Sequence, residues 1–140
     1  MATVTPATQV GTLSAMIRAM FPHERFPDGP YERSAEAIIE SGGTDIRIRG
    51  QLDAGLALLD AAGFGDMDAE AKLAHLHAIS GSTFFQTVRG AVITTLYDDA
   101  EVHALLGWEG ESFSQGGYEG RGFDDLDWLP EVEVDRDITA

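Results

Sequence analysis

The sequence contains no cysteine, and this absence excludes several kinds of site. Disulfides, iron–sulfur clusters, thiolate zinc sites and covalently attached c-type haem all need cysteine. Basic residues are also few, since 9 lysines and arginines stand against 24 acidic residues and give a net charge of −15. A surface of that sign repels nucleic-acid phosphates and anionic lipids. We therefore expect neither nucleic acid nor a membrane as a partner.

Long apolar runs are absent as well. No stretch reaches the roughly 18 apolar residues that a membrane span requires. The first nine residues have neither the basic region nor the apolar core of a signal peptide. These features predict a cytoplasmic protein, and the alternative is export together with a partner. With 140 residues and an apolar fraction of 44%, the chain has the composition of a soluble globular domain.

Apolar residues recur at helical spacing through the first three-quarters of the chain. This pattern predicts an all-α fold, with a small helical domain of about five to six helices over residues 1–106. The expected helices cover about residues 6–21, 30–40, 45–62, 68–79, 83–96 and 99–106. The fifth is the most apolar and is expected to be central. Its β-branched residues at positions 92–95 leave a strand as the alternative for that piece.

Capping and terminating residues set the expected ends of these helices. They are Ser41-Gly42-Gly43 after the second helix, Gly63 after the third, Asp66 or Asp68 before the fourth, Ser82 before the fifth, and Asp98 with Glu101 before the sixth, which Gly107 closes. In the fourth helix, the apolar spacing predicts that Leu73, Leu76 and Ile79 face the core.

Residues 107–140 have a different composition. Aromatic residues recur every five positions, at Trp108, Phe113, Tyr118, Phe123 and Trp128. Six glycines between residues 107 and 130 prevent sustained helix or strand periodicity. Ten acidic residues stand against two arginines from residue 109 onward. We expect an irregular, aromatic, glycine-rich and acidic extension that packs on the helical domain, on a partner subunit, or on both.

No catalytic, cofactor or metal site is predicted in this chain. His75 and His77 are two positions apart on an expected helix, so they point to different faces and cannot share a metal ion. Asp124, Asp125 and Asp127 resemble part of a calcium loop but lack its glycine and its distal glutamate. The glycines at Gly116-Gly117, Gly120 and Gly122 lack the lysine of a phosphate-binding loop. The Gly-x-Ser-x-Gly motif of a nucleophilic serine does not occur in the sequence.

Two sets of residues together resemble the gluconate 2-dehydrogenase subunit 3 family over about residues 10–130. The first set is Met20-Phe21-Pro22-His23 with Pro27-Asp28 and Tyr31. The second is Phe84-Phe85, Leu96-Tyr97-Asp98, Leu106-Gly107-Trp108-Glu109-Gly110, Gly116-Gly117-Tyr118 and Gly122-Phe123-Asp124-Asp125-Leu126-Asp127-Trp128-Leu129-Pro130. The C-terminal block is the more specific part of the resemblance.

The resemblance implies a non-catalytic small subunit of a flavin-dependent sugar or alcohol dehydrogenase of the glucose–methanol–choline type. In that family, a large subunit carries FAD and the catalytic base, and the small subunit supports its folding, maturation or stability. Many relatives also carry a twin-arginine export signal, and its absence here favours a cytoplasmic variant. The residues expected to bind the large subunit are Trp108, Tyr118, Phe123, Asp124, Asp125, Asp127, Trp128 and Leu129.

A second hypothesis is an independent helical enzyme or small-molecule-binding protein. In this case His23, Tyr31 and the turn at Asp124 to Asp127 would line a pocket. A soluble monomer that is active without a partner would favour it, whereas co-purification with a yellow large subunit would favour the first hypothesis.

Overall fold

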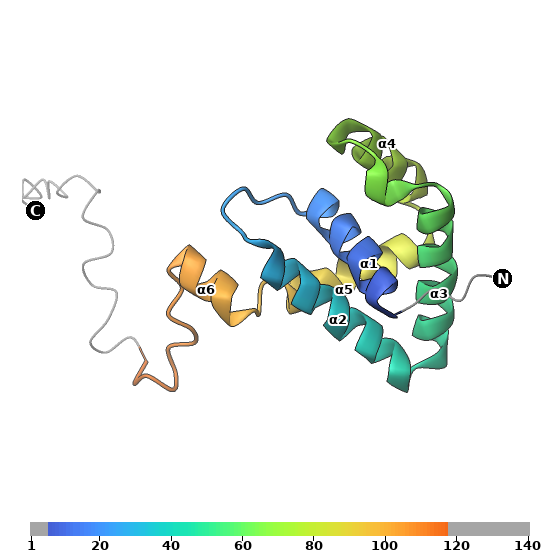
Figure 1. The fold of residues 1–140 in the computed structure, drawn as a ribbon. Helices are drawn as coiled ribbons and strands as arrows, with labels where there is room; N and C mark the ends of the chain where they lie inside the picture. Colours follow the sequence, from blue (N-terminus) through green and yellow to red (C-terminus); the bar gives the residue numbers. More distant parts are fainter. Residues whose placement is uncertain (1–5, 118–140) are drawn as a thin grey trace, which may run out of the picture. The chain divides into compact units, whose positions relative to one another are not determined.

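The structure is a computed structural model that describes residues 6–117, and this part of the chain is built from α-helices (Figure 1). The elements are α1 (Pro6–Met20), α2 (Asp28–Thr44), α3 (Ile46–Ala61), the 3-10 helix η1 (Phe64–Asp66), α4 (Ala69–Ile79), α5 (Thr83–Thr95) and α6 (Ala100–Leu106). No strand occurs within residues 6–117, so the predicted all-α fold is confirmed. None of the described helices combines the length and apolar character needed to cross a bilayer.

The chain divides after Trp108 into two compact units. The first unit contains all the helices named above. In the second unit the structure describes residues 109–117, which form turns without helix or strand. The amide of Gly117 donates to the carbonyl of Ser112 at 2.7 Å. Gly116 and Gly117 have φ values of +90° and +71°, which glycine adopts without strain.

The core of the first unit lies where α1, α2, α3 and α5 pack together (Figure 1). Its buried side chains include Leu13, Met16 and Ile17 from α1, Tyr31, Ala35 and Ile38 from α2, Leu52, Leu56 and Leu59 from α3, and Phe84, Val88 and Val92 from α5. Apart from the adjacent pair Met16 and Ile17, successive residues of this list within a helix are three or four positions apart, so they fall on one face. Residues 92–95 belong to α5, and the strand alternative for that piece is therefore wrong.

Helices α3 and α5 approach closely at Gly55. This glycine is buried, and a Cβ atom added to it would lie 2.2 Å from Cγ of Phe84. Any larger residue would therefore collide with the aromatic ring. The absence of a side chain at Gly55 is what lets Phe84 pack directly on the backbone of α3.

The predicted ends of the second helix are wrong. Helix α2 begins at Asp28 rather than Pro30, and it continues through Ser41-Gly42-Gly43 to Thr44. Gly42 is buried, and an added Cβ would lie 3.3 Å from Cα of Arg49 in α3. At this position glycine permits two helices to approach and does not end one. The chain turns instead at Asp45, whose carboxylate caps α3 by accepting from the amide of Arg47 at 2.8 Å.

Most other predicted caps are confirmed, with one error at the sixth helix. Asp68 and Ser82 accept hydrogen bonds from the first turns of α4 and α5, at 2.8 and 3.1 Å. Helix α6 is capped by Asp99 and not by Asp98, because the Asp99 carboxylate accepts from the amide of Glu101 at 3.0 Å. Gly107 ends α6 in the left-handed conformation at φ +72°, as expected.

The predicted inner face of α4 is only partly correct. Leu76 is buried and Ile79 packs at the edge of the core, whereas Leu73 is 51% exposed. The expectation for Leu73 is wrong because Leu76 is the one buried residue of α4, so the helix contacts the rest of the unit mainly there. The side chain of Leu73 instead borders a hollow between α4 and α1.

Candidate functional site

Of the eight residues predicted to bind a partner, the structure describes Trp108. Tyr118, Phe123, Asp124, Asp125, Asp127, Trp128 and Leu129 lie outside the described residues. Trp108 follows the glycine that ends α6, and its amide donates to the carbonyl of His103 at 2.9 Å. Its side chain is 52% exposed. About half of its surface is therefore accessible to solvent.

The ring of Trp108 is held by His103. The two rings meet edge to face, with centroids 4.2 Å apart and an interplanar angle of 88°. His103 is itself fixed, because its Nε2 lies 2.7 Å from the carbonyl oxygen of Tyr97. A carbonyl can only accept, so Nε2 carries the proton. Trp108 is thus positioned by a backbone hydrogen bond and by a histidine that is itself anchored.

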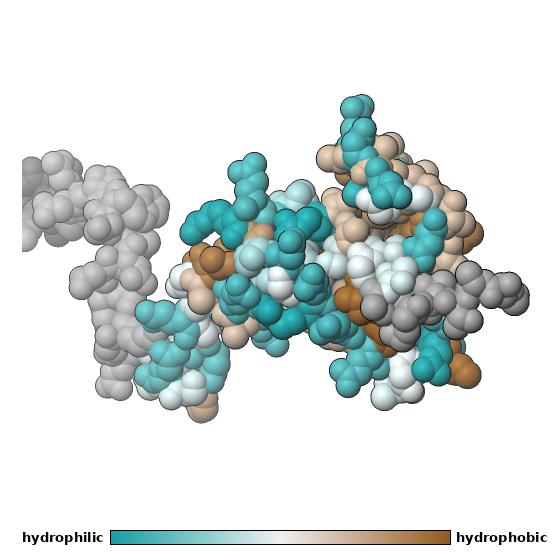
Figure 2. All heavy atoms as spheres, viewed as in Figure 1, coloured by the Kyte–Doolittle hydropathy of each residue, from teal (hydrophilic) through white to brown (hydrophobic). Residues whose placement is uncertain are grey.

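Leu106 lies two positions before Trp108 in the sequence and is 58% exposed. We refer to Leu106 and Trp108 together as the α6 apolar edge. Figure 2 shows hydrophobic atoms over α6, next to the hydrophilic surface of α2. Arg25 borders this region, and its Nη2 donates to the carbonyl of Leu105 at 3.4 Å. The sequence analysis included Trp108 among the partner-binding residues but missed Leu106.

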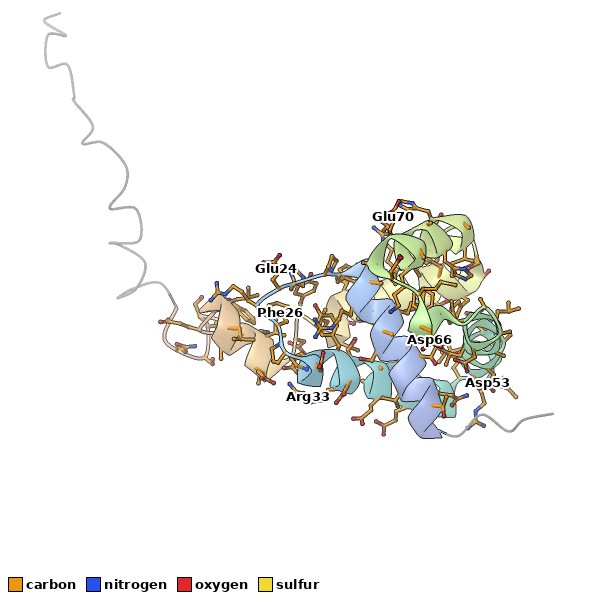
Figure 3. The ribbon with its side chains drawn as sticks, turned by 45° about the horizontal axis from the view of Figure 1, so that its top comes forward. Glu24, Phe26, Arg33, Asp53, Asp66 and Glu70 are labelled. Atoms are coloured by element: carbon orange, nitrogen blue, oxygen red, sulfur yellow. The ribbon has the colours of Figure 1, made fainter. Side chains whose placement is uncertain are left out.

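Helix α6 is attached to α2 by an ion-pair cluster. Arg33 donates through Nε and Nη2 to both carboxylate oxygens of Asp99, at 2.7 and 2.9 Å, and through Nη2 to Glu101 at 2.7 Å. These hydrogen bonds raise the pKa of Arg33, and they hold the pKa of Asp99 below its usual range. Figure 3 shows Arg33 near the end of α2 that lies toward α6. The cluster fixes the first turn of α6 and thereby helps to position the α6 apolar edge.

His23 and Tyr31, which the second hypothesis placed in one pocket, are indeed brought together. The amide of His23 donates to Tyr31 Oη at 3.2 Å, and Tyr31 Oη donates to the carbonyl of Phe21 at 2.7 Å. Nε2 of His23 lies 2.7 Å from Oη of Tyr97. Burial raises the pKa of Tyr97, and the nearby Tyr31 adds to this effect. Tyr31 is completely buried, so it fastens the loop after α1 and does not face a ligand.

A hollow of about 550 Å³ lies between α1 and α4, and we call it the α1–α4 hollow. It is lined by Ala15, Arg18 and Ala19 of α1, by Pro22, His23 and Glu24 of the following loop, and by Ala69, Lys72 and Leu73 of α4. His23, which the second hypothesis placed in a pocket, thus faces this hollow. The two cationic residues, Arg18 and Lys72, were not identified from the sequence.

His75 and His77 lie on α4. Within residues 6–117, no group of three or more His, Cys, Asp or Glu side chains is arranged to hold a metal ion. His75 packs against Phe64 with ring centroids 5.7 Å apart.

No protein-family model, curated protein or solved structure matches this chain. The relationship to the gluconate 2-dehydrogenase subunit 3 family therefore stays a prediction that rests on the sequence motifs.

Proposed function

We propose that this chain is a non-catalytic small subunit of a flavin-dependent sugar or alcohol dehydrogenase of the glucose–methanol–choline type. In this proposal it supports the folding, maturation or stability of a large subunit, which holds the FAD. The observation that carries the proposal is the α6 apolar edge, where Leu106 and Trp108 are both more than half exposed. Exposed apolar side chains of this size lower the free energy of a complex when another protein covers them.

The position of this edge supports the same function. Trp108 begins the aromatic segment whose motifs resemble the family, and the other predicted contact residues follow it in the sequence. Its ring is already held against His103 before any partner binds. A fixed aromatic side chain loses little conformational entropy on binding, which is typical of interface residues that contribute strongly to affinity.

The charge of the chain is compatible with this role. A net charge of −15 favours association with a basic surface and accelerates the encounter at low ionic strength. We expect Asp124, Asp125 and Asp127 to face basic groups on the large subunit. Their contribution should decrease with added salt if they lie at the rim of the interface.

Co-expression of the full chain with its flavoprotein partner tests the proposal. We expect the large subunit to be recovered soluble and loaded with FAD when this chain is present, and in much lower yield when it is absent. Leu106→Asp combined with Trp108→Asp should abolish the benefit, because two charges would then occupy the contact. Ile46→Asp is the matched control, since Ile46 is 85% exposed on α3, away from α6. A flavoprotein equally soluble, loaded and active without this chain would refute the proposal.

A further inference from the structure

The α1–α4 hollow exists because small residues line both of its walls. Ala15 and Ala19 face it from α1, and Ala69 faces it from α4. Longer side chains at these positions would fill the space between the helices. Leu73 adds an apolar wall that is half open to solvent. A volume of about 550 Å³ with mostly apolar walls is within the range of roughly 300–1,000 Å³ that is typical of small-molecule sites.

One wall of the hollow carries Arg18, which is held in place on three sides. Its Nη2 lies 2.5 Å from Oδ1 of Asp28 and 3.4 Å from the carbonyl of Phe26. The guanidinium also stacks over the ring of Tyr31, 4.3 Å from the centroid. A guanidinium has five N–H donors. Within the described residues, Nε and Nη1 of Arg18 make no hydrogen bond, so these donors are available to a ligand.

The other wall carries Lys72, which is the only lysine in the sequence. Its Nζ donates to the carbonyl of Gly65 at 3.0 Å and lies 5.9 Å from the ring centroid of Phe64. Within residues 6–117 no carboxylate lies within 4.0 Å of this ammonium group. Two of its three donors therefore remain for another acceptor. In a chain with a net charge of −15, two cations at one apolar hollow are an uncommon concentration of positive charge.

The nearby acidic groups limit which anion fits. Asp28 pairs with Arg18 and offsets part of its charge. Glu24 also borders the hollow, and Figure 3 shows it on the loop after α1, directed outward. A second negative charge on the ligand would be repelled by the carboxylate of Asp28, which lies against Arg18. The arrangement therefore favours a ligand with one carboxylate and an otherwise apolar body.

We propose that the α1–α4 hollow binds a small apolar monocarboxylate, with its chain against Ala15, Ala19 and Leu73 and its carboxylate between Arg18 and Lys72. A medium-chain fatty acid has this chemistry. This site goes beyond the function as a dehydrogenase subunit, because every residue that forms it lies within the first unit and needs no partner protein.

The test is a titration of the isolated full-length chain with decanoate below its critical micelle concentration. Binding is measured by calorimetry and by changes in the amide NMR chemical shifts. Decanol and decyltrimethylammonium serve as matched probes with no charge and with the opposite charge. We expect decanoate to bind about tenfold more tightly than decanol, with shifts at residues of α1 and α4, because a charge-assisted hydrogen bond contributes more than a neutral one. Equal affinity for the three probes, or no binding of decanoate, would overturn the proposal.

Variants locate the site. Lys72→Met replaces the lysine by an uncharged side chain of similar length. Because one charged hydrogen bond is lost, the substitution should lower the affinity for decanoate about fivefold to tenfold. Lys72→Gln serves as the second variant if the first is poorly folded. Arg47→Met on α3 is the matched control and should leave the affinity unchanged. Affinity that is insensitive to both substitutions of Lys72 would show that the carboxylate binds elsewhere.

Discussion

Truncation of Trp108 is expected to weaken the complex with the large subunit by roughly 100-fold. A tryptophan side chain buries up to about 250 Å². Because Trp108 is 52% exposed, roughly 130 Å² of its surface remains for a partner to cover. At about 25 cal/mol per Å² this area corresponds to about 3 kcal/mol. Each 1.4 kcal/mol changes the dissociation constant tenfold, so Trp108→Ala should raise it by about two orders of magnitude.

The covered half of Trp108 predicts a second effect of the same substitution. Loss of the contact with His103 should also lower the melting temperature of the isolated chain by several degrees. Calorimetric titration of the two subunits measures the dissociation constant, and thermal unfolding measures the second effect. Ile46→Ala, at an exposed position on α3, is the control and should change neither quantity. A lower melting temperature with an unchanged dissociation constant would show that Trp108 serves the fold alone.

Two further predictions concern the fold that positions this edge. Gly55→Ala should lower the free energy of unfolding by about 1–3 kcal/mol because the new Cβ meets Phe84. Gly50→Ala, on the same helix but in open space, should raise it by about 0.5–1 kcal/mol. A stabilising Gly55→Ala in chemical denaturation would contradict the close crossing. Asp99→Asn tests the ion-pair cluster. Because pairing with Arg33 lowers the pKa of Asp99 in the folded state, the pair stabilises the fold fully above the ordinary aspartate pKa of about 4. This stabilisation is lost as the pH falls through the pKa of Asp99 in the folded protein. The difference in melting temperature between Asp99→Asn and the wild type should thus be largest near neutral pH and should shrink below about pH 4. A difference that does not change with pH would contradict the role of this ion pair.

The helical fold could be predicted from the sequence because its signals are local. Asp45, Asp68 and Ser82 each place an oxygen where the first turn of the next helix needs an acceptor. Gly42 could not be interpreted in the same way. A glycine in a helix either ends it or admits a neighbouring helix, and the proximity of Arg49 decides between the two. That proximity depends on how α3 packs against α2, which spacing along the chain does not reveal.

The cap of α6 illustrates the same limit. Asp98 and Asp99 are chemically identical candidates on the basis of sequence alone. Arg33 selects Asp99 from 66 positions away by binding both of its carboxylate oxygens. A long-range ion pair thus determines where the helix begins.

The candidate sites differ in how far the sequence predicts them. Trp108 was predicted from the aromatic recurrence, which the order of residues along the chain reveals without any structure. The α1–α4 hollow was not, because Ala15, Ala19 and Ala69 look like ordinary helix-forming residues until the two helices are placed side by side. The one signal in the sequence was that Lys72 is the only lysine of a strongly acidic chain.

The central claim is that this chain acts as a subunit of a flavoprotein. Native mass spectrometry of the co-expressed complex tests it most directly, because the technique weighs the assembly with its cofactor. The account predicts one assembly of this chain, the large subunit and FAD, in which FAD remains with the large subunit when the assembly is dissociated in the gas phase. A chain detected only as a free monomer, or FAD leaving with the small chain, would contradict the account.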